Sequence, residues 1–258
     1  MNPFSKINLA AALACAVSLL SLTQIQAQPD PKYGIHDRSR PTPQHIEAGY
    51  PGTQDMAGKA PSDATILFDG TNLDKWVGSN NQPSKWIIKD GAMECTPGSG
   101  SIYTKDSYGD CHLHVEWASP AKVEGSDQGR GNSGVLFSAE RYEVQILDTY
   151  NNSTYADGYA GALYGQYPPS VNPIHKPGEW NNYDIIYIAP RFNEDGSLKS
   201  PARVTVLFNG VLVQWDRKLT GSTVTNEPYK QHDLRLPISL QDHGNPVRFR
   251  NIWIREIN

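Results

Sequence analysis

The segment RGNSGVLFSAERYEVQILD, residues 130–148, predicts two strands joined by a short turn. Side chains alternate between the two faces of a strand, so Glu143 and Gln145 share one face of the second strand. The opposite face is apolar and consists of Tyr142, Val144 and Ile146. A carboxylate beside a carboxamide, with Asp148 at the strand end, is typical of a polar ligand site. The solvent-exposed face of an antiparallel sheet gives the same alternation, so this segment alone leaves both interpretations open.

From residue 64 onward, short β-rich runs follow one another, and no convincing amphipathic helix interrupts them. Turn pairs separate these runs: Asp69-Gly70, Asp90-Gly91, Asp195-Gly196 and Asn209-Gly210. Such pairs tolerate positive φ and are a strong short-range signal for hairpins. About a dozen short strands predict an all-β fold, an antiparallel β-sandwich of jelly-roll type that spans residues 63–258.

Polar side chains recur on one face of several predicted strands, within residues 112–117, 142–147, 238–243 and 247–253. These polar residues are Glu116, Glu143, Gln145, Gln241, His243 and Arg250. Carboxylates, carboxamides and guanidinium groups suit the recognition of sugar hydroxyls and the transfer of protons. If the four strands are neighbours, we expect these side chains to line one concave groove. The tryptophans Trp86, Trp117, Trp215 and Trp253 are expected to be structural.

Aromatic residues are frequent in the Gly- and Pro-rich loop segment 155–180, which includes Tyr164. Aromatic faces on such loops often stack on the apolar face of a pyranose, which favours a carbohydrate site. The alternative for any single tyrosine is packing beneath the turns of the loop.

The N-terminal residues resemble a secretory signal peptide: Lys6 precedes an apolar segment, and small residues end at Ala27. We therefore expect a signal peptide over residues 1–27 and a periplasmic or secreted protein. Lipoprotein anchoring through Cys15 is the less favoured alternative. Residues 28–62 are rich in Pro and Gly and predict a loosely ordered extension. The rest of the chain is not apolar enough to predict a membrane span.

The formal net charge of −4 gives no electrostatic case for a nucleic-acid partner. After removal of the signal peptide, Cys95 and Cys111 remain. In an oxidising compartment they could form a disulfide, and the alternative is two small buried side chains. Their spacing does not resemble a zinc site. Oligomeric state is not indicated by any pattern in the sequence.

Several segments together resemble the 3-keto-disaccharide hydrolase family, long catalogued as a domain of unknown function. They are LFDGTNLDKW (67–76), WIIKDGAM (86–93), HVEW (114–117), RGNSGV (130–135), YEVQILD (142–148), GEWNNYDI (178–185), LFNG (207–210) and LQDHGNPVRFRNIWIREI (240–257). The resemblance covers roughly residues 64–257. It implies a concanavalin A-like, laminin G-like jelly roll. It also implies an exported or periplasmic enzyme whose partner is an oxidised mono- or disaccharide glycoside.

A ketone at C3 of such a sugar acidifies the proton on C2, so a carboxylate can remove it and the enolate can expel the C1 substituent. From residue type and strand position we assign Glu143 as the base and His243 as the acid or proton shuttle. Arg250, with Arg130 or Asn132, is expected to stabilise the enolate oxygen. The remaining predicted substrate-binding residues are Glu116, Gln145, Asp148, Tyr164 and Gln241.

Three alternatives to this assignment stay open. No cofactor is firmly implied, but a divalent metal ion could replace arginine at the enolate, with Glu116, Glu143, Asp148 and His243 as ligands. The domain could be a non-catalytic carbohydrate-binding module, because a fold does not fix a function. It could also be a classical glycosidase that acts on unoxidised sugars with Glu116 and Glu143 as its two carboxylates.

Overall fold

The computed structural model describes residues 32–257 and divides the chain into two units, Met1–His45 and Ile46–Asn258. In the first unit the described residues form turns and irregular chain, and the Tyr33 ring is flanked by the cationic groups of Lys32 and Arg40. The predicted signal peptide and Cys15 lie outside the described residues. The second unit begins at residue 46, so residues 46–62 belong with the strands that follow them.

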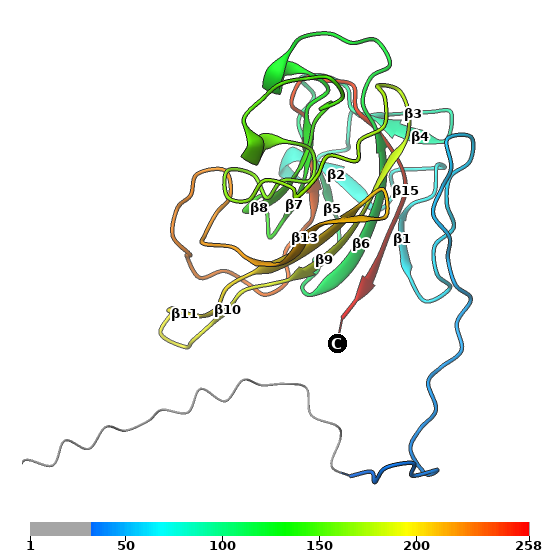
Figure 1. Ribbon diagram of the computed structural model, residues 1–258, viewed down its shortest axis with the longest axis vertical. Coiled ribbons are helices and arrows are strands. Elements are labelled where there is room, and N and C mark those ends of the chain that lie inside the picture. Colours follow the sequence, from blue (N-terminus) through cyan, green and yellow to red (C-terminus); the bar gives the residue numbers. More distant parts are fainter. Residues whose placement is uncertain (1–31, 258) are drawn as a thin grey trace, which may run out of the picture. The chain divides into compact units, whose positions relative to one another are not determined.

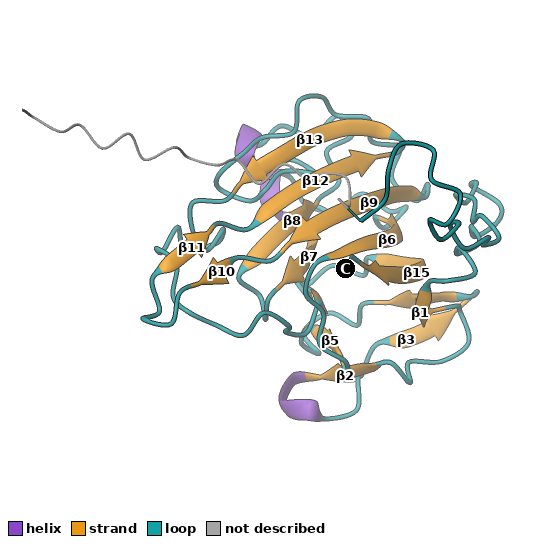
Figure 2. Cartoon of the chain, turned by 90° about the horizontal axis from the view of Figure 1, so that it is seen from below, coloured by secondary structure: helices purple, strands orange, loops and turns teal. Residues whose placement is uncertain are grey.

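The second unit contains two large antiparallel sheets, seen in Figures 1 and 2. The five-stranded sheet has the order β2 (Trp76–Gly78), β5 (Ile102–Thr104), β14 (Ser239–Leu240), β7 (Ser133–Phe137) and β8 (Tyr142–Ile146). The eight-stranded sheet has the order β13 (Val211–Lys218), β12 (Arg203–Phe208), β9 (Asn181–Ile188), β6 (Cys111–Ala118), β15 (Arg248–Glu256), β4 (Ala92–Glu94) and β3 (Ile87–Lys89), and β1 (Thr65–Phe68) also pairs with β15. The predicted all-β antiparallel sandwich of jelly-roll type is confirmed.

The remaining elements are short. A two-stranded sheet joins β10 (Arg191–Phe192) to β11 (Leu198–Ser200). Three 3-10 helices complete the described part of the chain: η1 (Ser79–Asn81), η2 (Asp127–Gly129) and η3 (Ala156–Gly158). None of the helices described in residues 32–257 is long and apolar enough to cross a membrane.

The core lies between the two large sheets and is made by the apolar face of each strand. Phe137 of β7 stacks on Tyr187 of β9 with ring centroids 4.4 Å apart. The Tyr183 hydroxyl of β9 donates to the backbone carbonyl of Gln145 on β8, at 2.8 Å. Burial of these large aromatic side chains is a major part of what holds the two sheets together. Each sheet therefore turns the other face of its strands outward, and both sites described below lie on such outer faces.

Local sequence signals account for the turns and for one irregular strand. Asn209 and Gly210 both have positive φ, 50° and 75°, as the predicted β12–β13 hairpin requires. In β15 the register shifts between Arg250 and Trp253, and Asn251 has a φ of 44°. This bulge moves Ile252 and Ile254 into the core. Trp253 consequently lies on the outer face, contrary to the alternation expected from the sequence.

Two further expectations about side chains are settled by the structure. Trp215 is 70% exposed, so its assignment to a structural position is wrong. Cys95 and Cys111 are both buried and both free, which is the alternative to a disulfide. Burial raises the pKa of both thiols, so they are poor nucleophiles.

Candidate active site

A small pocket of about 100 Å3 lies on the outer face of the five-stranded sheet, and we call it the Glu143 pocket. Its lining residues are Asn132, Glu143, Gln145, Tyr164, Val224, Gln241 and His243. All of these except Val224 are predicted site residues. Most of the lining of this pocket was therefore predicted from the sequence.

Strand order explains why residues distant in sequence meet here. In the β7–β8 pairing Gly134 lies opposite Gln145, and Leu136 lies opposite Glu143. On the other side of β7 is β14, and the backbone N–H of Gln241, just after β14, donates to the Gly134 carbonyl at 3.0 Å. Gln241 and His243 are thus placed beside the face that carries Glu143 and Gln145.

Gly134 provides the space that the Glu143 side chain occupies. A Cβ at position 134 would collide with the Glu143 carboxylate, so any larger residue would displace it. The next outward residue of β7 is Leu136, an apolar side chain that is itself buried. Glu143 therefore lies against backbone and hydrocarbon.

The Glu143 side chain is only 4% exposed, and no residue in the described part of the chain donates a hydrogen bond to its carboxylate. Burial raises the pKa of Glu143 to about 7, and the negative charge of nearby Glu140 adds to the shift. An uncompensated buried carboxyl that titrates near neutral pH is suited to general acid–base catalysis.

The two amide side chains of the pocket are oriented by Gln128 of η2. Its Oε1 accepts from Gln145 Nε2 at 3.0 Å, and its backbone carbonyl accepts from Asn132 Nδ2 at 2.7 Å. Gln128 Nε2 in turn donates to the Thr154 hydroxyl at 2.8 Å and to the Gly158 carbonyl at 3.1 Å, which fixes the orientation of the Gln128 amide.

This arrangement leaves two buried oxygens without a donor among the described residues, Asn132 Oδ1 and Gln145 Oε1. Buried acceptors without partners are costly in a folded protein, and such groups often mark a place where a ligand or water binds. Both oxygens would accept from hydroxyl groups. The wall of the pocket therefore offers two unfilled acceptors beside Glu143.

The mouth of the pocket is formed by more exposed groups. His243 is exposed, and Gln241 and Tyr164 are partly exposed. The Tyr164 hydroxyl is hydrogen-bonded to that of Tyr155, which links two aromatic rings at the rim. These side chains can reach a bound molecule from the solvent side.

Two predicted residues, Glu116 and Arg250, do not belong to the Glu143 pocket. They lie on β6 and β15 of the eight-stranded sheet, where Arg250 Nε contacts Glu116 Oε2 at 2.6 Å. The expectation that four polar strand faces form one groove is therefore wrong for these two strands. Both sheets have outward polar faces, and the alternation of residues does not reveal which sheet a strand joins.

Arg130 and Asp148 also have a different partner from the one expected. Arg130 Nε contacts Asp148 Oδ2 at 2.7 Å, and Arg130 Nη2 donates to the Tyr150 carbonyl at 2.9 Å. Both residues line a separate cavity of about 180 Å3. Because its guanidinium is already paired with a buried carboxylate, Arg130 is a structural clamp for the chain after β8.

Comparison with known proteins matches this chain to one family over the whole sandwich. The model of the 3-keto-alpha-glucoside-1,2-lyase-like domain matches residues 63–255. The chain belongs to this family. A Bacteroides thetaiotaomicron protein named 3-keto-disaccharide hydrolase is 26% identical over 239 residues, which cover 74% of this chain and 78% of that protein.

Solved structures support the same assignment. A Parabacteroides distasonis protein described as a candidate glycosyl hydrolase is 42% identical, with a TM-score of 0.77 over 86% of this chain and 96% of that one. A second protein from the same organism, also described as a candidate glycosyl hydrolase, is 21% identical with a TM-score of 0.58, over 76% of this chain and 94% of that one. The second likeness concerns the fold alone.

The four residues considered as metal ligands do not lie together in the structure. Glu116 lies on the other sheet, and Asp148 is paired with Arg130, so neither can share an ion with Glu143 and His243. Within residues 32–257, no group of three or more His, Cys, Asp or Glu side chains is placed to bind a metal ion. The predicted four-ligand set is therefore wrong.

Two residues that shape the Glu143 pocket, Gln128 and Gly134, were not predicted from the sequence. Gln128 lies in a short 3-10 helix within a loop, where no periodic pattern marks it. Gly134 is part of the quoted RGNSGV segment, and a glycine inside a strand is a recognised sign of close approach by another group. That signal was present and could have identified it.

Proposed function

We propose that this protein is an exported enzyme that cleaves the glycosidic bond of 3-keto-glycosides, with Glu143 as the base. The observation that carries the proposal is a buried carboxyl without a compensating donor, at a pKa of about 7, beside two amide oxygens that require hydroxyl partners. Membership of the family and the name of the curated relative supply the substrate class.

In the first chemical step the Glu143 carboxylate removes the proton from C2 of the sugar. The C–H electron pair forms the C2–C3 double bond, and the C3 carbonyl becomes an enolate oxygen. A carboxylate with a pKa near 7 is a stronger base than an ordinary glutamate and is still largely ionised at slightly alkaline pH. Asn132 Oδ1 and Gln145 Oε1 accept from sugar hydroxyls and orient C2 toward Glu143.

In the second step the enolate reforms the ketone, the C1–C2 double bond forms, and the C1–O bond breaks. His243 protonates the leaving oxygen, and Gln241 donates to the C3 oxygen while it carries charge. Water then adds to C1 and a proton returns to C2, so the net reaction is hydrolysis. Arg250 has no part in this scheme because it lies on the opposite sheet.

A classical glycosidase that uses Glu116 and Glu143 as its two carboxylates is not supported, because these residues lie on different sheets. Among the described residues that line the pocket, Glu143 is the only carboxylate. Retaining and inverting glycosidases both need two carboxyl groups flanking the bond. A single base is sufficient for elimination next to a ketone.

The decisive experiment compares a 3-keto-glucose disaccharide with its unoxidised form. We expect turnover of the oxidised sugar only. Deuterium at C2 should slow the reaction and exchange with solvent. Equal turnover of both sugars would contradict the proposal in favour of a classical glycosidase, and binding without turnover would favour a carbohydrate-binding module.

Export is the remaining part of the proposal and rests on the N-terminal sequence. We expect cleavage after Ala27, so the intact mass of protein secreted by a bacterial host should begin at Gln28. A retained N-terminus, or a lipid on Cys15, would contradict this part alone.

A further inference from the structure

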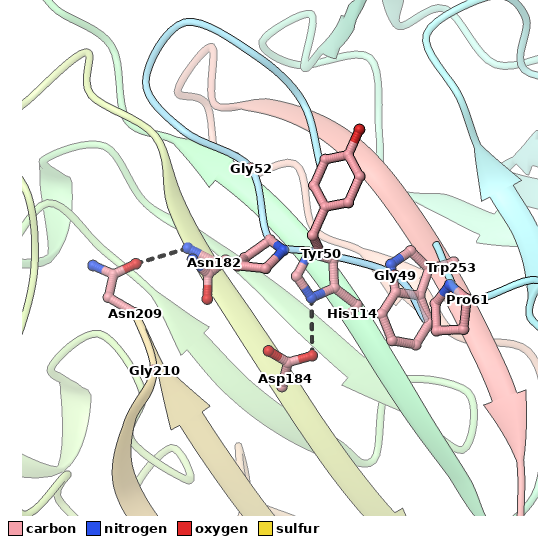
Figure 3. Close-up of a pocket in the computed structure, with 11 residues that line it drawn as sticks. Gly49, Tyr50, Gly52, Pro61, His114, Asn182, Asp184, Asn209, Gly210 and Trp253 are labelled. Carbon is pink, nitrogen blue, oxygen red and sulfur yellow. Dashed lines mark hydrogen bonds and ion pairs between the residues drawn. The ribbon is translucent and has the colours of Figure 1, made fainter. Parts of the chain in front are cut away.

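A second and larger cavity, of about 410 Å3, lies on the outer face of the eight-stranded sheet (Figure 3). It is lined by Gly49, Tyr50, Pro51, Gly52, Pro61, His114, Asn182, Asp184, Asn209, Gly210 and Trp253. Its volume is within the range of about 300–1,000 Å3 that is common for small-molecule sites. The Glu143 pocket is on the other sheet, so the two sites are separate.

One wall of this cavity is residues 49–61, which we call the strap. Tyr50 and Lys59 exchange two backbone hydrogen bonds of 2.9 Å, which closes the strap into a loop. The backbone N–H groups of Gly52 and Gly58 donate to Glu116 Oε1 at 3.1 and 2.8 Å. Because the strap is fastened to a buried carboxylate of the sheet, the cavity is formed before any ligand arrives.

The charged groups at the base of the cavity neutralise one another. Asp184 Oδ1 accepts from His112 Nε2 and from His114 Nδ1, both at 2.9 Å. Burial opposes a charge on His114, but Asp184 and the nearby Glu116 outweigh it and raise the pKa of His114 to about 9. Burial acts against charge on Asp184 as well, yet the two histidines keep the pKa of Asp184 well below its usual range. Neither group of the His114–Asp184 pair gains or loses a proton near neutral pH, so the pair is suited to binding rather than proton transfer.

Several polar groups of the cavity have unused hydrogen-bonding capacity. The Asn182 side-chain amide and the second oxygen of Asp184 have no hydrogen bond from residues 32–257. The buried Trp253 Nε1 likewise has no partner there, and only 6% of the Trp253 side chain is exposed. Donors and acceptors are thus both present, whereas the buried amide oxygens of the Glu143 pocket are acceptors alone.

Apolar surfaces complete the cavity. Tyr50 is half exposed and lines the cavity together with the rings of Pro61 and Trp253, and in Figure 3 its ring projects away from Asp184. Aromatic and proline faces cover the C–H faces of sugar rings, while amides and carboxylates bind their hydroxyls. A charged ligand would meet a balanced pair of opposite charges, and a purely apolar one would leave Asn182 and Asp184 unsatisfied.

We propose that this cavity is a second, non-catalytic binding site for a neutral mono- or disaccharide. Asn182 and Asp184 bind hydroxyl groups, and Tyr50 covers one face of the ring. The site is independent of the chemistry at Glu143. It would retain an unoxidised sugar chain or a leaving sugar near the protein.

Calorimetric titration of the protein with unoxidised cellobiose, maltose and trehalose tests this proposal. We expect at least one of them to bind the wild type and the Glu143→Gln variant equally. The Asn182→Leu and Tyr50→Ala variants should bind it at least tenfold more weakly and keep wild-type turnover of a 3-keto-disaccharide. Two variants are used because Asn182 is partly buried, whereas Tyr50 is an exposed strap residue and its loss should not affect folding.

Trp215→Ala is the matched control, since Trp215 is an exposed aromatic residue that does not line the cavity. It should bind like the wild type. The proposal is overturned if none of the three sugars binds, if Tyr50→Ala and Asn182→Leu bind normally, or if Glu143→Gln alone abolishes binding. Failure of 3-keto turnover would overturn the proposed function and leave this result unaffected.

Discussion

A glutamate is buried on the outer face of each sheet, and the two differ in their hydrogen-bond donors. Glu116 is 1% exposed and Glu143 is 4% exposed, so depth does not distinguish them. Glu116 receives hydrogen bonds from Arg250, Asn251, Gly52 and Gly58. Burial works against its charge, but His114 and the bonds from Asn251, Gly58 and Arg250 lower the pKa of Glu116. Glu143 receives no side-chain donor from the described residues, and burial raises its pKa.

Burial alone does not make a carboxylate structural or catalytic. A buried carboxylate with its donors in place stays charged, and removal of one partner is costly, whereas an unpaired one costs stability and titrates where chemistry can use it. Substitution of Glu116 and of Glu143 should therefore affect different properties of the protein.

The largest expected effect is on catalysis. Glu143→Gln removes the base and keeps the shape, so turnover of a 3-keto-disaccharide should fall by about 10³-fold. The matched control is Glu140→Gln, which removes a neighbouring exposed carboxylate and should keep the rate. In the wild type, the acid limb of the pH–rate profile is expected near pH 7, the pKa of Glu143. Glu140→Gln should move this limb to slightly lower pH, because the charge of Glu140 helps to raise that pKa. Full activity of Glu143→Gln would refute the base assignment.

Replacement of Glu116 should act on stability instead. Glu116→Gln leaves Arg250 buried without its charge partner, which is expected to cost about 3–5 kcal/mol in the free energy of unfolding. Denaturant titration measures this loss. Hydrogen exchange at the Gly52 and Gly58 amides should accelerate, because their shared acceptor is weakened. The fraction that remains folded should keep its turnover, and a loss of turnover without a loss of stability would contradict the contrast.

The same Glu143→Gln variant should be more stable than the wild type at high pH. The folded pKa of about 7 lies above the ordinary value of 4.5, so the folded state binds a proton that the unfolded chain loses between these values. Wild-type stability therefore decreases as pH rises from 4.5 to 7, by roughly 3 kcal/mol at most. The variant lacks this loss. Thermal unfolding at pH 8 and pH 4 should show a gain at pH 8 only, and equal gains at both would argue against an ionised buried Glu143.

The smallest effect is expected from Gln128, a positioning residue. Gln128→Ala removes the side-chain acceptor of Gln145 Nε2 and frees the Gln145 amide to rotate, so its oxygen no longer faces the substrate in a fixed orientation. The Asn132 amide keeps its bond to the backbone carbonyl of residue 128. KM should rise about tenfold, equivalent to about 1.4 kcal/mol, with a smaller change in kcat. Gln54→Ala is the control, since Gln54 bonds to Trp180 on the other sheet's face and should leave KM unchanged. An equal fall in kcat and kcat/KM would indicate a role in the transition state instead.

The fold could be predicted because its signals are local. Alternation fixes which residues of a strand face the core, and pairs such as Asn209-Gly210 mark the turns. The bulge at Asn251 was not predictable in this way, because one extra residue reverses the alternation of everything after it.

The site was predicted only in part, because strand order is a long-range property. Glu143 and His243 meet since β14 inserts between β5 and β7, and no local pattern encodes that insertion. Glu116 and Arg250 have the same alternation but join the other sheet. Gln128 lies in a loop, where its contacts depend on the complete fold.

The fastening of residues 49–61 to Glu116 has a practical consequence for anyone who trims this protein. A chain begun at residue 63, where the family match starts, would lack the two glycine amides and the Thr53 and Met56 carbonyls that Arg250 binds. The shortened protein would expose the Glu116–Arg250 ion pair to water, from which residues 49–61 shield it in the intact chain. The start of the recognisable family sequence and the start of the folding unit are therefore different positions, and the second lies near residue 46.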